Sequence, residues 1–144
     1  MSLWKQIKIM KIITLILSVL LIACTSKDIT PTTIVGKWNP TYITQTKQSD
    51  GNFEPWHTIN TLVALPVYEF TNDGRFLRDG NSGATCCNSG NNYYILKNEI
   101  IFSDLLSCPT VKCAGLPKWT IIEIKDDTLI LEEFNTRNKY VKIK

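Results

Sequence analysis

The sequence is poor in the residues on which most catalytic sites depend. Its 144 residues include a single histidine, His57, which is expected in a loop beside Trp56. No Gly-x-Ser-x-Gly or Cys-x-x-Cys motif occurs, and the glycine-rich stretch 80–91 lacks the lysine of a phosphate-binding loop. Glu132 and Glu133 are expected on opposite faces of one strand, so they cannot form an acid–base pair with each other. We therefore expect a protein that is not an enzyme, with no catalytic residues and no cofactor.

A basic excess is also missing once the first residues are set aside. Lys5, Lys8 and Lys11 account for the whole net charge of +3, and the chain from residue 24 onward has 13 basic and 13 acidic side chains. Proteins that bind a phosphate backbone need clustered positive charge. We therefore expect no nucleic-acid partner.

Long hydrophobic runs are absent except for one, which extends from Ile12 to Ala23. As a helix this run would span about 18 Å, against the ~30 Å of a bilayer's hydrocarbon layer. A lysine-containing start followed by a short apolar run is typical of a secretory signal. Residues 1–23 are therefore predicted to be a signal peptide, with translation beginning at either Met1 or Met10.

The end of that run, Leu21-Ile22-Ala23-Cys24, resembles the lipobox of bacterial lipoprotein precursors. The resemblance implies that the chain is cut before Cys24 and that the cysteine sulfur receives a diacylglycerol. Two or more acyl chains, such as palmitate, give stable anchoring, whereas one chain is marginal. Residues 24–33 would then be the lipidated cysteine and a flexible tether, with the lipid bilayer as a partner. The implied location is the bacterial cell envelope, at the outer membrane, its periplasmic face or the cell surface.

Residues 34–144 show no sustained helical period and are predicted to form one all-β domain. The connections after the second, fourth and sixth strands are short, and Asn72-Asp73-Gly74 is a strong hairpin signal. The connections after the first, third and fifth are long, so the long loops should meet at one rim. We predict an eight-stranded antiparallel up-and-down barrel, because closure removes exposed strand edges. The expected strands are 36–45, 67–71, 75–79, 92–97, 100–105, 118–125, 128–134 and 139–144, with Thr58 to Leu65 left undecided between strand and loop.

The first strand opens with Gly36-Lys37-Trp38, which resembles the Gly-x-Trp signature of lipocalins. Together with the alternation of short and long connections, it makes the chain similar to the lipocalin-like domains of bacterial lipoproteins over residues 34–144. The resemblance implies that Trp38 plugs the closed end and that a ligand mouth lies at the long-loop rim. An arginine packs on the signature Trp in that family, and Arg137 is the candidate here. The chain departs from the family in having no helix after the last strand.

Four cysteines lie in two of the long connections: Cys86, Cys87, Cys108 and Cys113. Because both connections are expected at one rim, we predict two loop-to-loop disulfides, in either of the two crossed pairings. Each would contribute roughly 3 kcal/mol in the chain-entropy model. A zinc site built from the four thiolates is disfavoured by the spacing and by an oxidising exported setting, so no metal is expected.

Two functions are compatible with this barrel. The first is binding of a small hydrophobic ligand among inward side chains, although an eight-stranded barrel can also be filled by its own side chains. The alternative is an envelope module whose disulfide-linked rim docks another envelope protein. The predicted ligand-binding residues are Tyr42, Tyr68, Phe70, Tyr94, Ile122 and Leu131, with Phe53 and Trp56 near the mouth.

Overall fold

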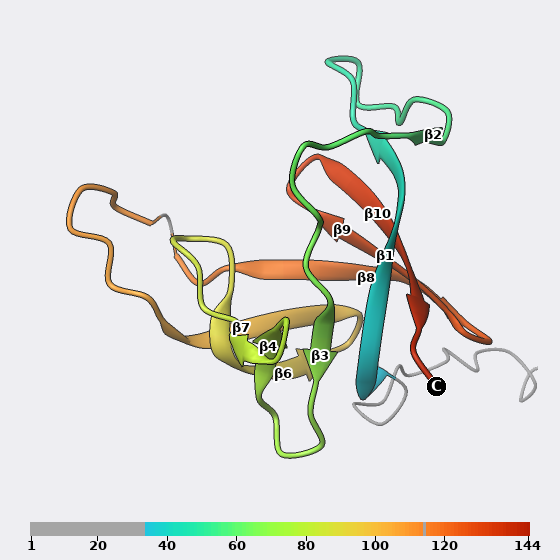
Figure 1. The fold of residues 1–144 in the computed structure, drawn as a ribbon. Coiled ribbons are helices and arrows are strands. Elements are labelled where there is room, and N and C mark those ends of the chain that lie inside the picture. The colour runs from blue at the N-terminus through green and yellow to red at the C-terminus, as the bar shows by residue number, and fades with distance from the viewer. Residues whose placement is uncertain (1–33, 114) are drawn as a thin grey trace, which may run out of the picture.

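The computed structural model describes residues 34–113 and 115–144; the predicted signal peptide, Cys24 and the tether lie outside the described residues. The described chain forms ten antiparallel strands in one sheet (Figure 1). Within this part of the chain, no helix has the length and hydropathy of a membrane span. The strands are β1 (Gly36–Thr46), β2 (His57–Thr58), β3 (Tyr68–Phe70), β4 (Phe76–Arg78), β5 (Asn81–Ser82), β6 (Gly90–Leu96), β7 (Glu99–Leu105), β8 (Lys118–Lys125), β9 (Thr128–Glu133) and β10 (Thr136–Lys142).

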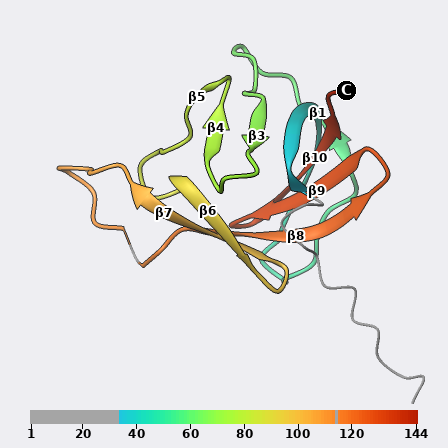
Figure 2. The ribbon, with the colours of Figure 1, turned by 90° about the horizontal axis from the view of Figure 1, so that it is seen from below.

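The sheet curls into a nearly closed barrel, as Figure 2 shows from one end. Its strand order is β5-β4-β3-β1-β10-β9-β8-β7-β6, so the first long strand pairs with the last. The seam lies between β4 and β6, where Arg75 and Asn92 form a single bridge and Tyr93 N donates to Gly74 O at 2.8 Å. The predicted all-β antiparallel barrel is therefore confirmed; β2 and β5 are two-residue additions to the eight expected strands.

Two strands begin more than one residue away from the predicted position, each for a physical reason. β6 begins at Gly90, where a Cβ would clash with the backbone carbonyl of Ser103 on β7, so the glycine permits close pairing. The last hairpin is tighter than the predicted turn at 135–138, because Thr136 already pairs with Glu133. Phe134 makes this short turn with φ of 54°.

A bend divides β1 into two parts. The register with β10 shifts between Pro40 and Thr44, and Tyr42 has φ of 63°. The hydroxyl of Thr41 donates to Lys139 O at 2.8 Å and holds the two strands together at the irregularity. Below the bend β1 pairs with β3 and β10; above it β1 pairs with β2 and β10 and extends beyond the barrel (Figure 1).

Trp38 lies at the closed end, as predicted. It is fully buried, and its Nε1 donates to Ile34 O at 2.7 Å. The cation that packs on this ring is Lys142, whose Nζ is 5.3 Å from the ring centroid. The prediction of Arg137 was wrong: that guanidinium lies 3.7 Å from the Phe53 ring instead.

The short and long connections separate as expected. In Figure 1 the loop from β4 to β6 and the loop from β7 to β8 lie together on one side, away from the β6–β7 and β8–β9 hairpins. The β3–β4 hairpin is tight, with Gly74 N donating to Thr71 O at 3.1 Å and Gly74 at φ of 81°. The barrel therefore has a closed pole and a mouth bordered by long loops.

Candidate functional site: the barrel mouth

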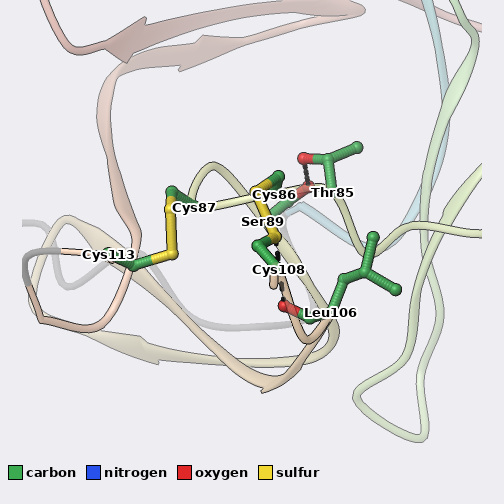
Figure 3. Close-up of a disulfide and its surroundings, with 7 residues drawn as sticks. All are labelled: Thr85, Cys86, Cys87, Ser89, Leu106, Cys108 and Cys113. Atoms are coloured by element: carbon green, nitrogen blue, oxygen red, sulfur yellow. Dashed lines mark hydrogen bonds between the residues drawn. A yellow bond between two sulfur atoms is a disulfide. The ribbon is translucent and has the colours of Figure 1, made fainter. Parts of the chain in front are cut away.

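Two disulfides fix the loops on one side of the mouth. Cys86 bonds to Cys108 and Cys87 to Cys113, one of the two crossed pairings that the sequence predicted (Figure 3). Beside them, the hydroxyl of Ser89 donates to Gly83 O at 2.7 Å. The two disulfides tie the β4–β6 connection to the β7–β8 connection, and the hydrogen bond braces the β4–β6 connection internally.

Below the mouth, the barrel is filled by its own aromatic side chains. The Phe102 and Trp119 ring centroids are 4.7 Å apart, and the Phe76 and Trp119 centroids are 5.3 Å apart. Such offset and edge-to-face packing is the preferred arrangement of buried rings. Phe70 and Leu131 are fully buried in this cluster, which makes them core residues rather than walls of an open cavity.

Above this core, a pocket of about 190 Å³ opens at the mouth. Its walls come from β1, β3, β9 and β10 and from the segment that leads into β3. Among the predicted ligand residues, Tyr68 lines this pocket. Tyr42 acts beside it, because Leu65 N donates to the Tyr42 hydroxyl at 3.2 Å and is held in the wall. The lining residues are Pro40, Ile59, Leu65, Pro66, Tyr68, Glu133, Asn138 and Tyr140.

Glu133 gives the pocket a buried acidic group. The hydroxyl of Tyr140 donates to Glu133 Oε1 at 3.1 Å. Burial raises the pKa of Glu133 from 4.5 to about 6, while hydrogen bonds from Tyr140 and Asn88 and the charge of Arg78 act in the opposite direction. Among its apolar side chains the pocket therefore contains a carboxyl group that titrates near pH 6.

Two predicted wall residues lie on the outer face of the barrel. Tyr94 is 52% exposed, whereas its neighbour Tyr93 is 7% exposed and faces inward. Ile122 is 39% exposed because a bulge between Ile121 and Glu123 changes the alternation of β8. The predicted inward positions of Tyr94 and Ile122 were therefore wrong by one residue.

Phe53 and Trp56 pack away from the pocket, on the outer face of β10. Arg137 covers the Phe53 ring, and Lys139 Nζ is 5.0 Å from the Trp56 centroid. These two basic residues alternate along β10 with Asn138 and Tyr140, which line the pocket, so the aromatic pair is on the opposite side of the strand. Their predicted position near the mouth opening is corrected accordingly.

Glu133 and Tyr140 were not among the residues predicted from the sequence. The signal that identifies Glu133 is its register, since it follows the inward Leu129 and Leu131 at two-residue steps on β9. A carboxylate that continues an inward series is unusual enough to mark a site.

A second hollow lies outside the barrel, next to the disulfide between Cys87 and Cys113. It has a volume of about 390 Å³ and includes the exposed apolar side chains of Leu116 and Phe134. Lys118, Thr120 and Glu132, which point outward from β8 and β9, complete it together with Gly115 and Pro117.

His57 lies on the exposed arm above the barrel. Its Nδ1 is 3.4 Å from Glu54 Oε1 and 3.4 Å from Pro55 O. In the described ranges 34–113 and 115–144, no group of three or more His, Cys, Asp or Glu side chains is placed to hold a metal ion.

No protein-family model matches the chain, and no curated protein matches it. The chain is similar to a lipocalin-like protein from Bacteroides uniformis, with 20% sequence identity and a TM-score of 0.42, over 77% of this chain and 99% of that chain.

Proposed function

We propose that this protein is a non-catalytic, lipid-anchored binding protein of the bacterial cell envelope, with a lipocalin-like barrel whose mouth holds a small ligand. The observation that carries the proposal is the 190 Å³ pocket above a packed core. Apolar walls with a few convergent polar groups, here Glu133, Asn138 and the tyrosine hydroxyls, are characteristic of small-molecule sites.

The pocket volume limits the size of the ligand. An apolar cavity of about 150 Å³ can hold benzene, so a pocket of this volume accepts one ring or the end of a longer chain. The packed rings of Phe76, Phe102 and Trp119 prevent deeper entry. The ligand is therefore smaller than the one expected for an empty barrel.

The anchor and the mouth would lie at opposite poles. The described chain enters β1 at Gly36, beside the buried Trp38 of the closed end. A lipid on Cys24 would therefore attach the barrel through its closed pole and leave the mouth accessible. The anchor itself is tested by mass spectrometry of protein isolated from its own membranes, where Cys24→Ala should lose the lipid mass.

A pair of variants on one loop tests the pocket. Leu65 lines the pocket, whereas Leu62 is fully exposed three residues earlier. We expect Leu65→Trp to fill the pocket and weaken binding of the neutral single-ring probe benzyl alcohol at least about tenfold, while Leu62→Trp leaves it unchanged. NMR titration of backbone amides measures both. Equal binding by the two variants would contradict the proposal.

The outer hollow supports a second function, docking of an envelope protein. Leu106, Val111, Leu116 and Phe134 are exposed apolar side chains around the disulfide-linked loops. Exposed apolar groups on a rigid rim favour a protein contact. Replacing Leu116 and Phe134 by serine should abolish cross-linking to such a partner without changing benzyl alcohol binding; loss of both together would argue against a separate docking surface.

A further inference from the structure

Glu133 differs from most other glutamates of the barrel in lacking a cationic partner. Glu69, Glu99 and Glu132 form ion pairs with Lys37, Lys118 and Arg137 respectively. Among the residues that the structure describes, no ion pair includes Glu133, although it is the carboxylate that lines the mouth pocket.

We propose that the mouth pocket selects small organic amines, with an ammonium group that pairs with the Glu133 carboxylate and an apolar body that lies against the pocket walls. This rests on the proposed binding function and names its ligand class. A buried carboxylate without a counter-ion is costly, and a ligand ammonium removes that cost by supplying the missing charge.

The surroundings of the carboxylate suit a cation. Tyr68 and Tyr140 line the pocket, and the Tyr140 hydroxyl donates to Glu133 Oε1 at 3.1 Å. Tyr68 stacks on both Tyr140 and Trp119, with centroids 5.2 Å apart in each pair, so its ring is engaged by neighbouring rings and the carboxylate is the group that attracts a cation. The rest of the wall, from Pro40, Ile59, Leu65 and Pro66, offers no charge and suits a hydrocarbon body.

Arg78 is the competing recognition group. It is the cross-strand partner of Tyr68, so both side chains are on the inner face, and its buried Nε has no hydrogen-bond partner among the described residues. An anion would be its natural ligand. Arg78 does not line the pocket, however, whereas Glu133 does. Of the interactions that shift the pKa of Glu133, the one with the Arg78 charge has the smallest effect. The geometry therefore favours an amine.

Glu133 would make this binding depend on pH. Four residues interact with its carboxyl group through hydrogen bonds or charge: Tyr140 on β10, Tyr68 on β3, Arg78 on β4 and Asn88 in the loop before β6. Burial raises the pKa of both tyrosines, which stay neutral through the physiological range. Among Tyr68, Tyr140 and Glu133, the carboxyl group alone changes charge around pH 6. Amine affinity should therefore fall as the pH drops through this value.

Three probes of one shape test the proposal: benzylamine, benzyl alcohol and benzoate. Each is titrated into the full-length protein and followed by amide NMR shifts of the pocket residues. We expect benzylamine to bind about 10- to 100-fold more tightly than benzyl alcohol at neutral pH, as a charge-assisted hydrogen bond implies. The preference should shrink as the pH falls through 6 and disappear below about pH 4, where Glu133 is protonated in the complex as well.

Two neighbouring variants provide the control. Glu133→Gln keeps the shape and removes the charge, so it should abolish the benzylamine preference and its pH dependence while benzyl alcohol still binds. Glu132→Gln removes a charge on the opposite face of β9 and should leave both unchanged. Circular dichroism checks that each variant is folded.

The outcomes separate the two proposals. If benzyl alcohol binds in the pocket as tightly as benzylamine, the amine selectivity is wrong and the binding function stands. Tighter binding of benzoate also overturns it and assigns recognition to Arg78. If none of the three probes shifts the pocket amides, both the binding function and the amine selectivity fail.

Discussion

The two poles of this barrel are stabilised in different ways. At the closed pole, rings and aliphatic side chains pack around Trp38, and short connections of two to five residues join β3 to β4, β6 to β7 and β8 to β9. At the mouth, long loops depend on disulfides, and the interior contains a carboxyl group with tyrosine hydroxyls. We infer that packing at the closed pole supplies stability that allows the mouth to hold an energetically costly buried carboxyl group.

The largest effect is expected at the closed pole. Trp38→Ala removes a fully buried ring together with the hydrogen bond from its Nε1 to Ile34 O. We expect a loss of about 3–5 kcal/mol in the free energy of unfolding, measured by urea denaturation. Trp56→Ala, on the partly exposed arm, should cost less than about 1 kcal/mol. Similar losses for both would mean that the buried packing around Trp38 contributes no more than an exposed surface contact.

Next in size is the loss of a disulfide at the mouth. The Cys86–Cys108 bond closes a sequence separation of 22 residues, so replacing both cysteines by alanine should cost roughly 3 kcal/mol. Hydrogen exchange should increase chiefly in the loops 79–89 and 106–117, with β1 and β10 remaining protected. Uniform deprotection of the barrel would show that the rim and the closed pole unfold as one unit.

A smaller effect, of opposite sign, is expected for Glu133→Gln. A carboxyl group whose pKa is raised from 4.5 to about 6 binds its proton more tightly in the folded state. The wild type should therefore lose stability as the pH rises through the interval between these values, by about 1–2 kcal/mol in total. The variant should lack this dependence and be more stable by a similar amount at neutral pH, as measured by thermal unfolding. A wild type that instead gains stability over the interval would contradict the assigned pKa.

The smallest effect should come from a surface ion pair. Lys118 Nζ lies 2.6 Å from Glu99 Oε1 on the exposed outer face. Lys118→Ala is expected to change stability by less than about 1 kcal/mol, and added salt should reduce the difference. A loss as large as that of Trp38→Ala would mean that outer-face charges, rather than core packing, hold β7 to β8.

The sequence predicted the features that depend on local chemistry. Asn72-Asp73-Gly74 predicts its hairpin because few residues adopt such turns, and the alternation of loop lengths predicts that Cys86 and Cys108 share a rim. Trp38 at the closed end follows from the resemblance in its motif.

The features that depend on tertiary register were missed. Tyr93 and Tyr94 are adjacent residues of the same type, and only pairing with β7 determines which one faces inward. At Ile122, a bulge reverses an alternation that the sequence makes look regular. The pocket wall at Ile59 and Leu65 forms because the segment before β3 folds over the mouth, and no local pattern marks that contact.

The most direct test of the mouth site is the titration of Glu133 itself. With side-chain ¹³C labelling, NMR should give Glu133 a pKa of about 6, and saturation with benzylamine should lower it towards 4.5 or below. A value close to 4.5 that benzylamine leaves unchanged would contradict both the buried carboxyl group and its role in amine selection.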